Sequence, residues 1–457
     1  MPPSLLQLML MLFSLVSLVL FGGFALVSFR EKELRAGWIA SGFTLLTLLI
    51  FLTPVFLTET IQLWVILLTV FITLAFFIAM LLPIGKLNLA HEQAKERFDE
   101  RQTVFARNGL IPGSERFRSY YEQHPEDLEK DDAWRKNPGL LSPRALFAEP
   151  LSFAATDASF MTLATLGTLA DGPVAPTSES ITPEAGTQYI KSLAKFYGAL
   201  NFGTCELNKA YIYTHVGRGA GIYGEPIALD HRYAIAMTFE MNHALIGANP
   251  RPPGVMETGH EYVESAIAAV QLAAAIRNLG YPARAHFEGN YQVIAPPIAR
   301  DAGLGEIGRM SLLMTPQQGP RVRLAVVTTD MPLDPDRPTI DPSVIDFCRM
   351  CKKCATTCPS RAISFENRKV TNGALRWVID PVACYSYWTK VGTDCGVCMR
   401  VCPFAHGSSW HHQLIRWGIR NSGFFRRAAL VMDDVFYGKT PKPRPVPGWD
   451  WLPKNIH

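Results

Sequence analysis

The chain has 457 residues, and its 44 Lys and Arg against 40 Asp and Glu give a net charge of +4. The charge is mild and no basic run is interleaved with aromatic residues, which excludes a clustered cationic surface for nucleic acid. The length exceeds that of one ordinary domain, so we expect several.

Three apolar runs open the chain, and each is close to the ~20 residues needed to cross a bilayer. They are Leu5 to Phe29, Trp38 to Leu57 and Leu63 to Ile84. A cleavable signal peptide is the alternative for the first run, but Met1 to Gln7 holds none of the cations that such a peptide requires. We therefore expect residues 1–84 to form three transmembrane helices.

The Lys and Arg residues beside these runs orient the predicted helices. The first loop carries three, the second loop from Thr58 to Gln62 carries none, and residues 85–101 carry four. They are Arg30, Lys32 and Arg35, then Lys86, Lys95, Arg97 and Arg101. Because cytoplasmic loops hold the excess of cations, we expect a multi-pass protein of a bacterial or archaeal cell membrane, with its main domains in the cytoplasm. That compartment is reducing, which suits free thiols.

The pattern after the helices predicts a linker and then an α/β domain. Residues 85–142 are charged and proline-punctuated, as in a juxtamembrane helical or polar linker. Residues 143–345 alternate strand-like and helical patterns. The strand-like segments are Ala210 to His215, Tyr233 to Glu240 and Val322 to Thr329, and the helical one is Glu261 to Leu279. Residues 406–457 are expected to hold a closing amphipathic helix, Trp410 to Gly438, and a proline-rich tail.

Two glycine-rich segments lie within the α/β domain. Residues Gly303, Gly305 and Gly308 form a Gly-x-Gly-x-x-Gly pattern that includes Glu306, and Gly217 and Gly219 belong to a second segment. The first pattern is the dinucleotide fingerprint, but the Pro-rich residues before it make a poor central strand, so a nicotinamide site is not expected. Simple tight turns and close approach to a flat cofactor both remain open.

Four polar residues of this domain are candidates for acid–base or electrostatic roles. Tyr262 lies on the helix that Glu257-Thr258-Gly259 opens, Asn290 lies in a loop, and Arg321 and Arg323 begin a strand. A guanidinium near a phenol favours the phenolate, which would lower the pKa of the tyrosine and make it a better proton donor. Taken singly, each residue also fits a structural role at the edge of the core or in an ion pair.

Eight of the nine cysteines form two proline-terminated arrays, the spacing of a pair of 4Fe–4S clusters within a ferredoxin-like module at 346–405. Because the cysteine before proline reaches the other cluster, we expect the arrays to exchange one ligand each. The first set is Cys348, Cys351, Cys354 and Cys402, and the second is Cys358, Cys384, Cys395 and Cys398. Disulfides or two zinc sites are the alternatives. The remaining cysteine, Cys205, is expected to be a buried hydrophobe.

Several ordered segments between Tyr211 and Gly438 resemble the corrinoid-dependent reductive dehalogenases. They are Thr214-His215-Val216-Gly217-Arg218-Gly219, Glu240-Met241-Asn242, Thr258-Gly259-His260-Glu261-Tyr262, Ala302-Gly303-Leu304-Gly305-Glu306-Ile307-Gly308-Arg309, Thr315-Pro316-Gln317-Gln318-Gly319-Pro320-Arg321-Val322-Arg323, Gly392-Thr393-Asp394-Cys395-Gly396-Val397-Cys398-Met399 and Met432-Asp433-Asp434-Val435-Phe436-Tyr437-Gly438. The resemblance implies a nitroreductase-like α/β core that holds a base-off cobalamin beside two 4Fe–4S clusters. No Asp-x-His-x-x-Gly segment offers the cobalt an axial histidine.

The resemblance also implies a reaction, replacement of a halogen by hydrogen on an organohalide, and roles for the residues. Tyr262 would be the proton donor, supported by Arg321 with Asn290, and Arg323 is the rival for the cation. The cofactor-binding candidates are Gly303, Gly305, Glu306, Gly308, Gly217 and Gly219. The electrons would come from a separate ferredoxin, flavodoxin or quinol-linked partner, because no flavin or nicotinamide domain is apparent.

One departure from the family and two competing functions remain. Usual members carry a twin-arginine leader and act outside the membrane on a separate three-helix anchor, whereas this chain carries its own predicted helices, oriented inward. The similar epoxyqueuosine reductases are soluble and recognise tRNA, which fits poorly with three transmembrane helices and no basic patch. A non-catalytic, membrane-anchored iron–sulfur electron carrier would leave about 200 residues of α/β domain without a purpose.

Overall fold

The computed structural model describes residues 3–82, 94–338, 341–371 and 373–446. The chain divides into two compact units, the first made of Met1–Asn88 with His406–Pro445 and the second of Leu89–Ala405 with Val446–His457. The C-terminal segment, expected as a separate closing element, therefore belongs with the N-terminal helices.

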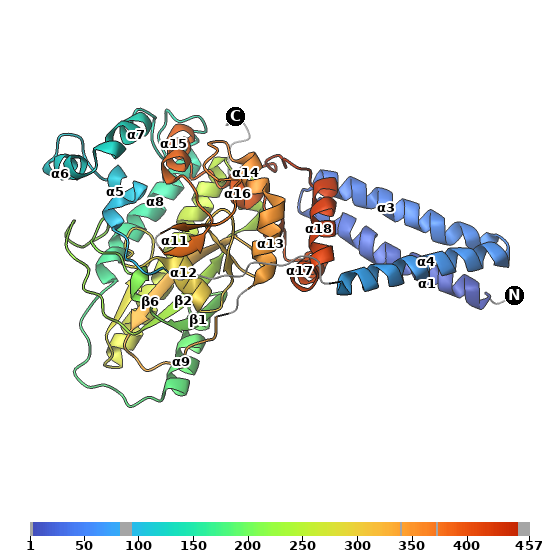
Figure 1. Ribbon diagram of the computed structural model, residues 1–457, viewed down its shortest axis with the longest axis horizontal. Coiled ribbons are helices and arrows are strands. Elements are labelled where there is room, and N and C mark those ends of the chain that lie inside the picture. The colour runs from blue at the N-terminus through green and yellow to red at the C-terminus, as the bar shows by residue number, and fades with distance from the viewer. Residues whose placement is uncertain (1–2, 83–93, 339–340, 372, 447–457) are drawn as a thin grey trace. The chain divides into compact units, whose positions relative to one another are not determined.

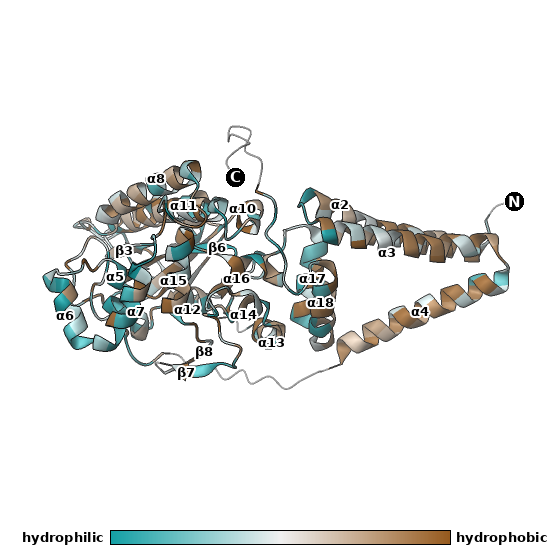
Figure 2. Cartoon of the chain, turned by 90° about the horizontal axis from the view of Figure 1, so that it is seen from above, coloured by the Kyte–Doolittle hydropathy of each residue, from teal (hydrophilic) through white to brown (hydrophobic). Residues whose placement is uncertain are grey.

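The first unit is built on three long apolar helical spans, Leu5–Arg30, Leu34–Phe56 and Glu59–Leu81. Each is long and apolar enough to cross a membrane, and Figure 2 shows α3 and α4 as hydrophobic over most of their length. Their elements are α1 (Leu5–Ser17), the π-helical turn η1 (Leu18–Gly22), α2 (Gly23–Arg30), α3 (Leu34–Leu52), η2 (Thr53–Phe56) and α4 (Glu59–Leu81). The helices begin and end within about four residues of the predicted apolar runs at the described ends, while Ile84 lies outside the described residues.

Two further helices complete the first unit, α17 (Trp410–Asn421) and α18 (Gly423–Phe436). The sequence predicted one continuous helix here. The chain instead breaks at Ser422, which has an extended backbone and caps α18 by accepting a hydrogen bond from the Phe425 amide at 3.2 Å.

The second unit contains a four-stranded sheet in the order β1-β2-β6-β3, with every pair antiparallel. The strands are β1 (Asn201–Glu206), β2 (Tyr233–Glu240), β3 (Ala283–His286) and β6 (Val322–Thr329). The predictions for β2 and β6 are confirmed at both ends. The predicted strand from Ala210 to His215 is wrong, because the Asn208 side chain caps a 3-10 turn, η5 (Lys209–Tyr211), and only isolated bridges follow.

Helices cover both faces of this sheet (Figure 1). Residues of β2 alternate, so that Ile235 and Met237 pack toward α11 (Pro252–Asn278), whereas Ala234 and Ala236 pack toward α12 (Ala295–Asp301). The α11 face also carries α8 (Pro150–Leu166) and α9 (Pro183–Phe196). Helix α11 begins earlier than the sequence predicted, because Pro252 and Pro253 occupy its first positions, where no amide donor is needed.

The described part of the predicted linker, residues 94–142, packs within the second unit rather than acting as a spacer. It forms α5 (Val104–Asn108), α6 (Glu115–Gln123) and α7 (Pro125–Arg135). Its Arg97 donates hydrogen bonds to the carbonyls of Ile212 and Ile227, at 3.1 and 2.8 Å. Residues 85–93 of this prediction lie outside the described residues.

The cysteine arrays occupy short helices joined by tight turns. These elements are α13 (Pro342–Cys351), α14 (Lys353–Thr357), α15 (Pro381–Val391) and α16 (Val397–Arg400), with a hairpin of β7 (Lys369–Thr371) and β8 (Ala374–Arg376). Left-handed residues separate consecutive cysteines at Lys352 (φ 54°) and Gly396 (φ 60°). The backbone therefore curls around each array, and α14 packs against α16.

Candidate active site

Tyr262 and Arg323 meet where α11 crosses β6. The Cζ of Arg323 lies 4.6 Å from the ring centroid of Tyr262, and Arg323 Nη1 lies 3.4 Å from the phenol oxygen. Arg323 Nη2 also donates to Thr258 Oγ1 at 2.6 Å and to Asp394 Oδ2 at 3.3 Å. Thr258 and Tyr262 share a helix face because they are four residues apart. The pair is thus held by three segments, including the loop that carries Cys395.

The protonation of Tyr262 is governed by burial. Burial raises the pKa of the phenol, and the opposing effect of the Arg323 cation is smaller. The expectation of a lowered pKa is therefore wrong, because loss of water outweighs the attraction of one guanidinium. At neutral pH Tyr262 carries its proton, as a donor must.

Arg321 lies in a different environment from Arg323. Its side chain is 1% exposed, donates to the carbonyl of Ala405 at 2.8 Å and to that of Met241 at 2.6 Å, and pairs with Glu240 at 3.1 Å. These bonds tie the start of β6 to neighbouring backbone. The cation in contact with Tyr262 is Arg323, which the sequence offered only as the rival.

Asn290 is buried in the loop after β3. Its Nδ2 donates to the Gly167 carbonyl at 3.3 Å, and its Oδ1 accepts from Arg284 Nη2 at 3.4 Å. The structure therefore places both polar ends of this amide against protein groups. Its predicted role toward a substrate stays a prediction.

Sequence reasoning missed a charged network close to Tyr262. Arg218 bridges two carboxylates, Glu288 at 2.8 Å and the fully buried Glu100 at 3.2 Å. The negative charge of Glu288 helps to raise the pKa of Tyr262, after burial. Arg218 lies beside Gly217 and Gly219, and this glycine-rich segment could have pointed to it. Glu100 lies in the predicted linker, where no sequence feature indicated a functional residue.

The predicted cofactor-binding glycines are explained in part by contacts within the protein. A Cβ on Gly219 (φ +84°) would lie 2.6 Å from Asn290 Oδ1, and one on Gly305 (φ +154°) 2.2 Å from the Met314 carbonyl oxygen. The same holds for Gly217 against Glu100 and for Gly308 against Met314, and Gly303 also has a positive φ. Glu306 is buried and accepts from its neighbour's amide at 2.8 Å. Contact of these six residues with a cofactor stays a prediction.

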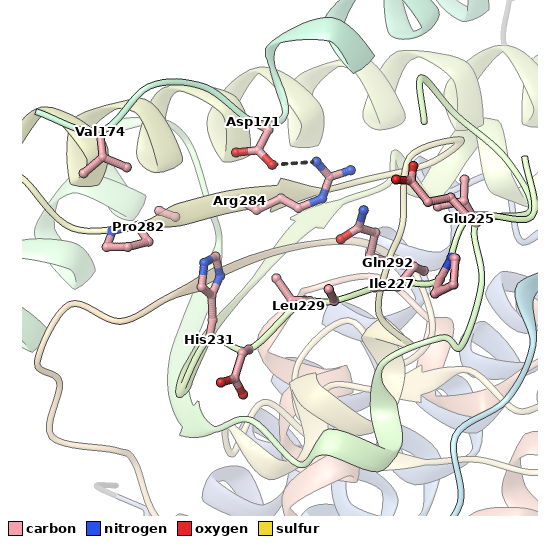
Figure 3. Close-up of a pocket in the computed structure, with 14 residues that line it drawn as sticks. Asp171, Val174, Glu225, Ile227, Leu229, His231, Pro282, Arg284 and Gln292 are labelled. Atoms are coloured by element: carbon pink, nitrogen blue, oxygen red, sulfur yellow. Dashed lines mark hydrogen bonds and ion pairs between the residues drawn. The ribbon is translucent and has the colours of Figure 1, made fainter. Parts of the chain in front are cut away.

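A pocket of about 380 Å³ opens at the edge strand β3 (Figure 3). Arg284 reaches Asp171 across it, with 3.4 Å between their side chains, and His231 lines another wall and bonds to Thr328. Arg284 lies opposite Thr328 in the sheet register, so both point to the α12 face. Arg323, an odd number of residues away on β6, points to the other face. The sheet therefore separates this pocket from Tyr262.

All nine cysteines of the chain are free thiols, and the array cysteines raise one another's pKa in two overlapping groups. Burial, and then the thiols of Cys348, Cys351 and Cys354, raise the pKa of Cys402. In the second group, burial and the neighbouring thiols of Cys384 and Cys358 raise the pKa of Cys398. Cys395 also lies near Cys398 and Cys384, and the groups adjoin between Cys354 and Cys398. Each array therefore contributes one cysteine to the neighbourhood of the other.

The proline-terminated spacing of the two arrays is typical of a pair of 4Fe–4S clusters rather than of single ions. In a 4Fe–4S cluster each thiolate binds a different iron atom, so the four sulfurs surround a larger volume than one ion needs. Within the described ranges, no three His, Cys, Asp or Glu side chains are placed to hold one metal ion.

Buried polar atoms of Arg323, which contacts Tyr262, of Asp394 and of Asn249 also lack protein partners among the described residues. They are Arg323 Nε, Asp394 Oδ1 and both side-chain atoms of Asn249, a residue wedged between Gly254 and Gly396. Buried polar groups are nearly always paired, so unpaired ones indicate a missing ligand or water. The donors and acceptors present are thus compatible with a polar-edged cofactor at this place.

Comparison with known proteins agrees with this geometry. The family model of the 4Fe-4S dicluster domain matches residues 347–406. The tetrachloroethene reductive dehalogenase of Sulfurospirillum multivorans is 35% identical over 295 residues, which is 57% of this chain and 58% of that protein. A solved reductive dehalogenase, described with a mechanism for B12-dependent dehalogenation, has a TM-score of 0.63 at 25% identity and covers 78% of this chain and 49% of its own.

This chain is similar to the reductive dehalogenases over more than half of its length. It spans about half the length of the relatives it matches. Epoxyqueuosine reductase of Listeria monocytogenes is also similar, at 28% identity over 129 residues, but this match covers only 25% of the chain. The reductive dehalogenases therefore account for far more of the sequence than the tRNA-modifying relatives do.

Proposed function

We propose that this protein is a membrane-anchored reductive dehalogenase that converts R–X, two electrons and a proton to R–H and a halide ion. The observation that carries the proposal is the Tyr262–Arg323 pair, held against the Asp394 loop of the cysteine module. It joins a proton donor to the path by which electrons would arrive. Similarity to dehalogenases over 57% of the chain supports it.

The proposed cofactors are a base-off cobalamin, in a nitroreductase-like core, and two 4Fe–4S clusters. The cobalamin would supply the low-potential centre that no side chain can provide. Arg323 Nε and Asp394 Oδ1 are buried polar atoms available to it, and Gly303, Gly305, Glu306, Gly308, Gly217 and Gly219 remain candidates for its backbone contacts.

The protein's own residues would manage the proton and the charge. Tyr262 holds a proton on its hydroxyl, since burial raises its pKa, and releases it to the carbon that loses halide. Arg323 then offsets the charge of the phenolate and keeps the ring in place. Asp394 and Thr258 fix Arg323 through its Nη2.

The cysteines would conduct electrons one at a time. We assign Cys348, Cys351, Cys354 and Cys402 to one cluster and Cys358, Cys384, Cys395 and Cys398 to the other, on the grounds of spacing and of the two groups of neighbouring thiols. An external ferredoxin, flavodoxin or quinol-linked partner would reduce them. The three helices would cross the membrane with the catalytic unit on the cytoplasmic side, as the cation count favours.

Anaerobic purification with iron and corrinoid analysis tests this proposal, followed by halide release from haloalkanes and haloaromatics with reduced methyl viologen. We expect iron, corrinoid and release of chloride, bromide or iodide. Iron–sulfur absorbance without corrin bands after reconstitution with cobalamin would leave only an electron carrier. Conversion of epoxyqueuosine in tRNA without halide release would identify the tRNA-modifying alternative.

A further inference from the structure

Helix α17 has its polar and apolar faces inverted relative to a water-soluble helix. Its buried side chains include His411, His412 and Arg416, at 3 to 8% exposure. Its exposed side chains include Trp410 at 51% and Trp417 at 57%, with Leu414 at 47% between them. A helix that faces water places its charged residues outside.

Helix α18 shows the same inversion. Arg426 and Asp433 are buried, whereas Val431 is 64% exposed and Val435, one turn further on, is 42% exposed. Both helices therefore carry exposed apolar side chains. Exposed Arg420 and Arg427 lie among these side chains on the same helices.

Several buried polar groups of this helix pair have partners within the first unit, although both ring nitrogens of His411 have none among the described residues. His406 pairs with Asp433 at 2.7 Å, and His412 reaches Glu31 of the first loop at 3.3 Å. Arg426 donates to the Ile419 carbonyl at 3.0 Å. Hydrogen bonds within the first unit therefore accompany the apolar exterior of this helix pair.

Aromatic contacts place the pair at one end of the apolar spans, where Figures 1 and 2 both draw it. The Phe436 ring lies 5.4 Å from that of Phe24 and 5.9 Å from that of Phe43, and Phe425 lies 6.2 Å from Phe76. Phe76 precedes the end of α4 at Leu81 by five residues, roughly 8 Å along the helix. The pair thus contacts the spans inside their ends, as a segment in the boundary between headgroups and acyl chains would.

We propose that the α17–α18 pair is embedded in the interfacial layer of the bilayer that the three spans cross, with Trp410, Leu414 and Trp417 in contact with lipid. The lipid-facing surface of the spans continues onto this apolar exterior. Tryptophan is enriched at the membrane interface, and arginine extends its charge to the headgroups. Lipid is therefore the partner of this surface. Both the three N-terminal spans and the α17–α18 pair would then contact the membrane.

Photocrosslinking tests this placement in the full chain, reconstituted in nanodiscs of phosphatidylethanolamine and phosphatidylglycerol. The photoreactive residue p-benzoylphenylalanine would replace Leu414 or Trp417, with Trp64 of α4 as the positive control. Ile222, an apolar side chain of the second unit with 71% exposure, is the matched negative control. We expect mass spectrometry to find lipid adducts at 414 and 417 in yields similar to position 64, and none at 222.

Two results would overturn the proposal. Adducts at 64 without lipid adducts at 414 and 417 would place the pair outside the lipid. Adducts from 414 or 417 to a second copy of the chain would make this surface a protein interface instead. Neither result depends on dehalogenase activity, so the placement and the proposed reaction can fail separately.

Discussion

The guanidinium of Arg323 lies over the ring of Tyr262, with 4.6 Å between Cζ and the ring centroid. A cation above the ring orients it and stabilises the phenolate that forms once the proton leaves. Because burial raises the pKa of this phenol, the proton stays in place until a stronger base develops beside it. The arrangement stores one proton in a site otherwise poor in water.

Replacement of Tyr262 by Phe tests the donor directly. We expect Tyr262→Phe to retain corrinoid and iron but to lose roughly 10²- to 10⁴-fold in halide release, the usual contribution of a positioned acid. Tyr281→Phe removes an equivalent hydroxyl, one that donates to the Glu179 carbonyl, and should have normal activity. Near-normal turnover of the Tyr262 variant would remove this residue from the mechanism.

The two strand arginines should differ in what their loss affects. Arg323→Lys keeps the charge but loses the planar contact with Tyr262, so turnover should fall while the melting temperature changes little. Arg321→Met leaves the Met241 and Ala405 carbonyls without a donor, at a cost of about 1–3 kcal/mol each. The main effect of Arg321→Met should therefore be a lower melting temperature. If Arg321→Met lowered turnover and Arg323→Lys lowered the melting temperature instead, Arg321 would be the catalytic cation.

Glu261, beside the donor on α11, should make stability depend on pH. Burial, and then the carboxylates of Glu257 and Glu264, raise its pKa to about 7. As pH rises above 4.5, the unfolded chain loses this proton while the folded chain keeps it, which destabilises the fold up to about pH 7. Glu261→Gln should therefore raise the melting temperature at pH 8, with a gain that disappears toward pH 4.5.

A matched substitution controls for this effect. Glu184→Gln changes an exposed carboxyl on α9 and should shift the melting temperature little at either pH. An equal gain for Glu261→Gln at pH 8 and pH 4.5 would contradict the raised pKa.

The crossed cysteines can be tested by EPR and iron analysis. Cys402→Ala should disable the cluster held by Cys348, Cys351 and Cys354, although Cys402 lies in the other array, and Cys358→Ala should disable the second cluster. Cys205→Ala, a buried thiol near the Ile298 carbonyl, should retain both signals. Loss of the opposite signal in either array variant would overturn the assignment.

Local sequence pattern was sufficient to predict some of the helices and strands of this protein. Long apolar runs predicted the three spans, and β2 and β6 were found at their predicted ends, because a buried strand is continuous in hydrophobicity. Helix α11 was predicted too short, although Pro252 and Pro253 marked its start. Reading these as helix-opening prolines would have corrected the boundary.

The active site depended on contacts that no local pattern carries. Arg321 and Arg323 are two residues apart and would share a face in an ideal strand. Arg321 precedes β6 and turns toward Ala405, so only tertiary structure distinguishes them. Glu100 and Arg218 come from segments 118 residues apart. Likewise, the raised pKa of Tyr262 follows from burial, which its neighbours in sequence do not reveal.

The pairing of Phe24 with Phe436 has a consequence for biosynthesis. The ribosome delivers Phe24 long before Phe436, its aromatic partner. Until then, the anchor lacks the groups that cover Glu31 and Phe24. Contacts between residues so distant in sequence form late and slowly. The packing of this anchor is therefore complete only after every residue between Phe24 and Phe436 has been translated.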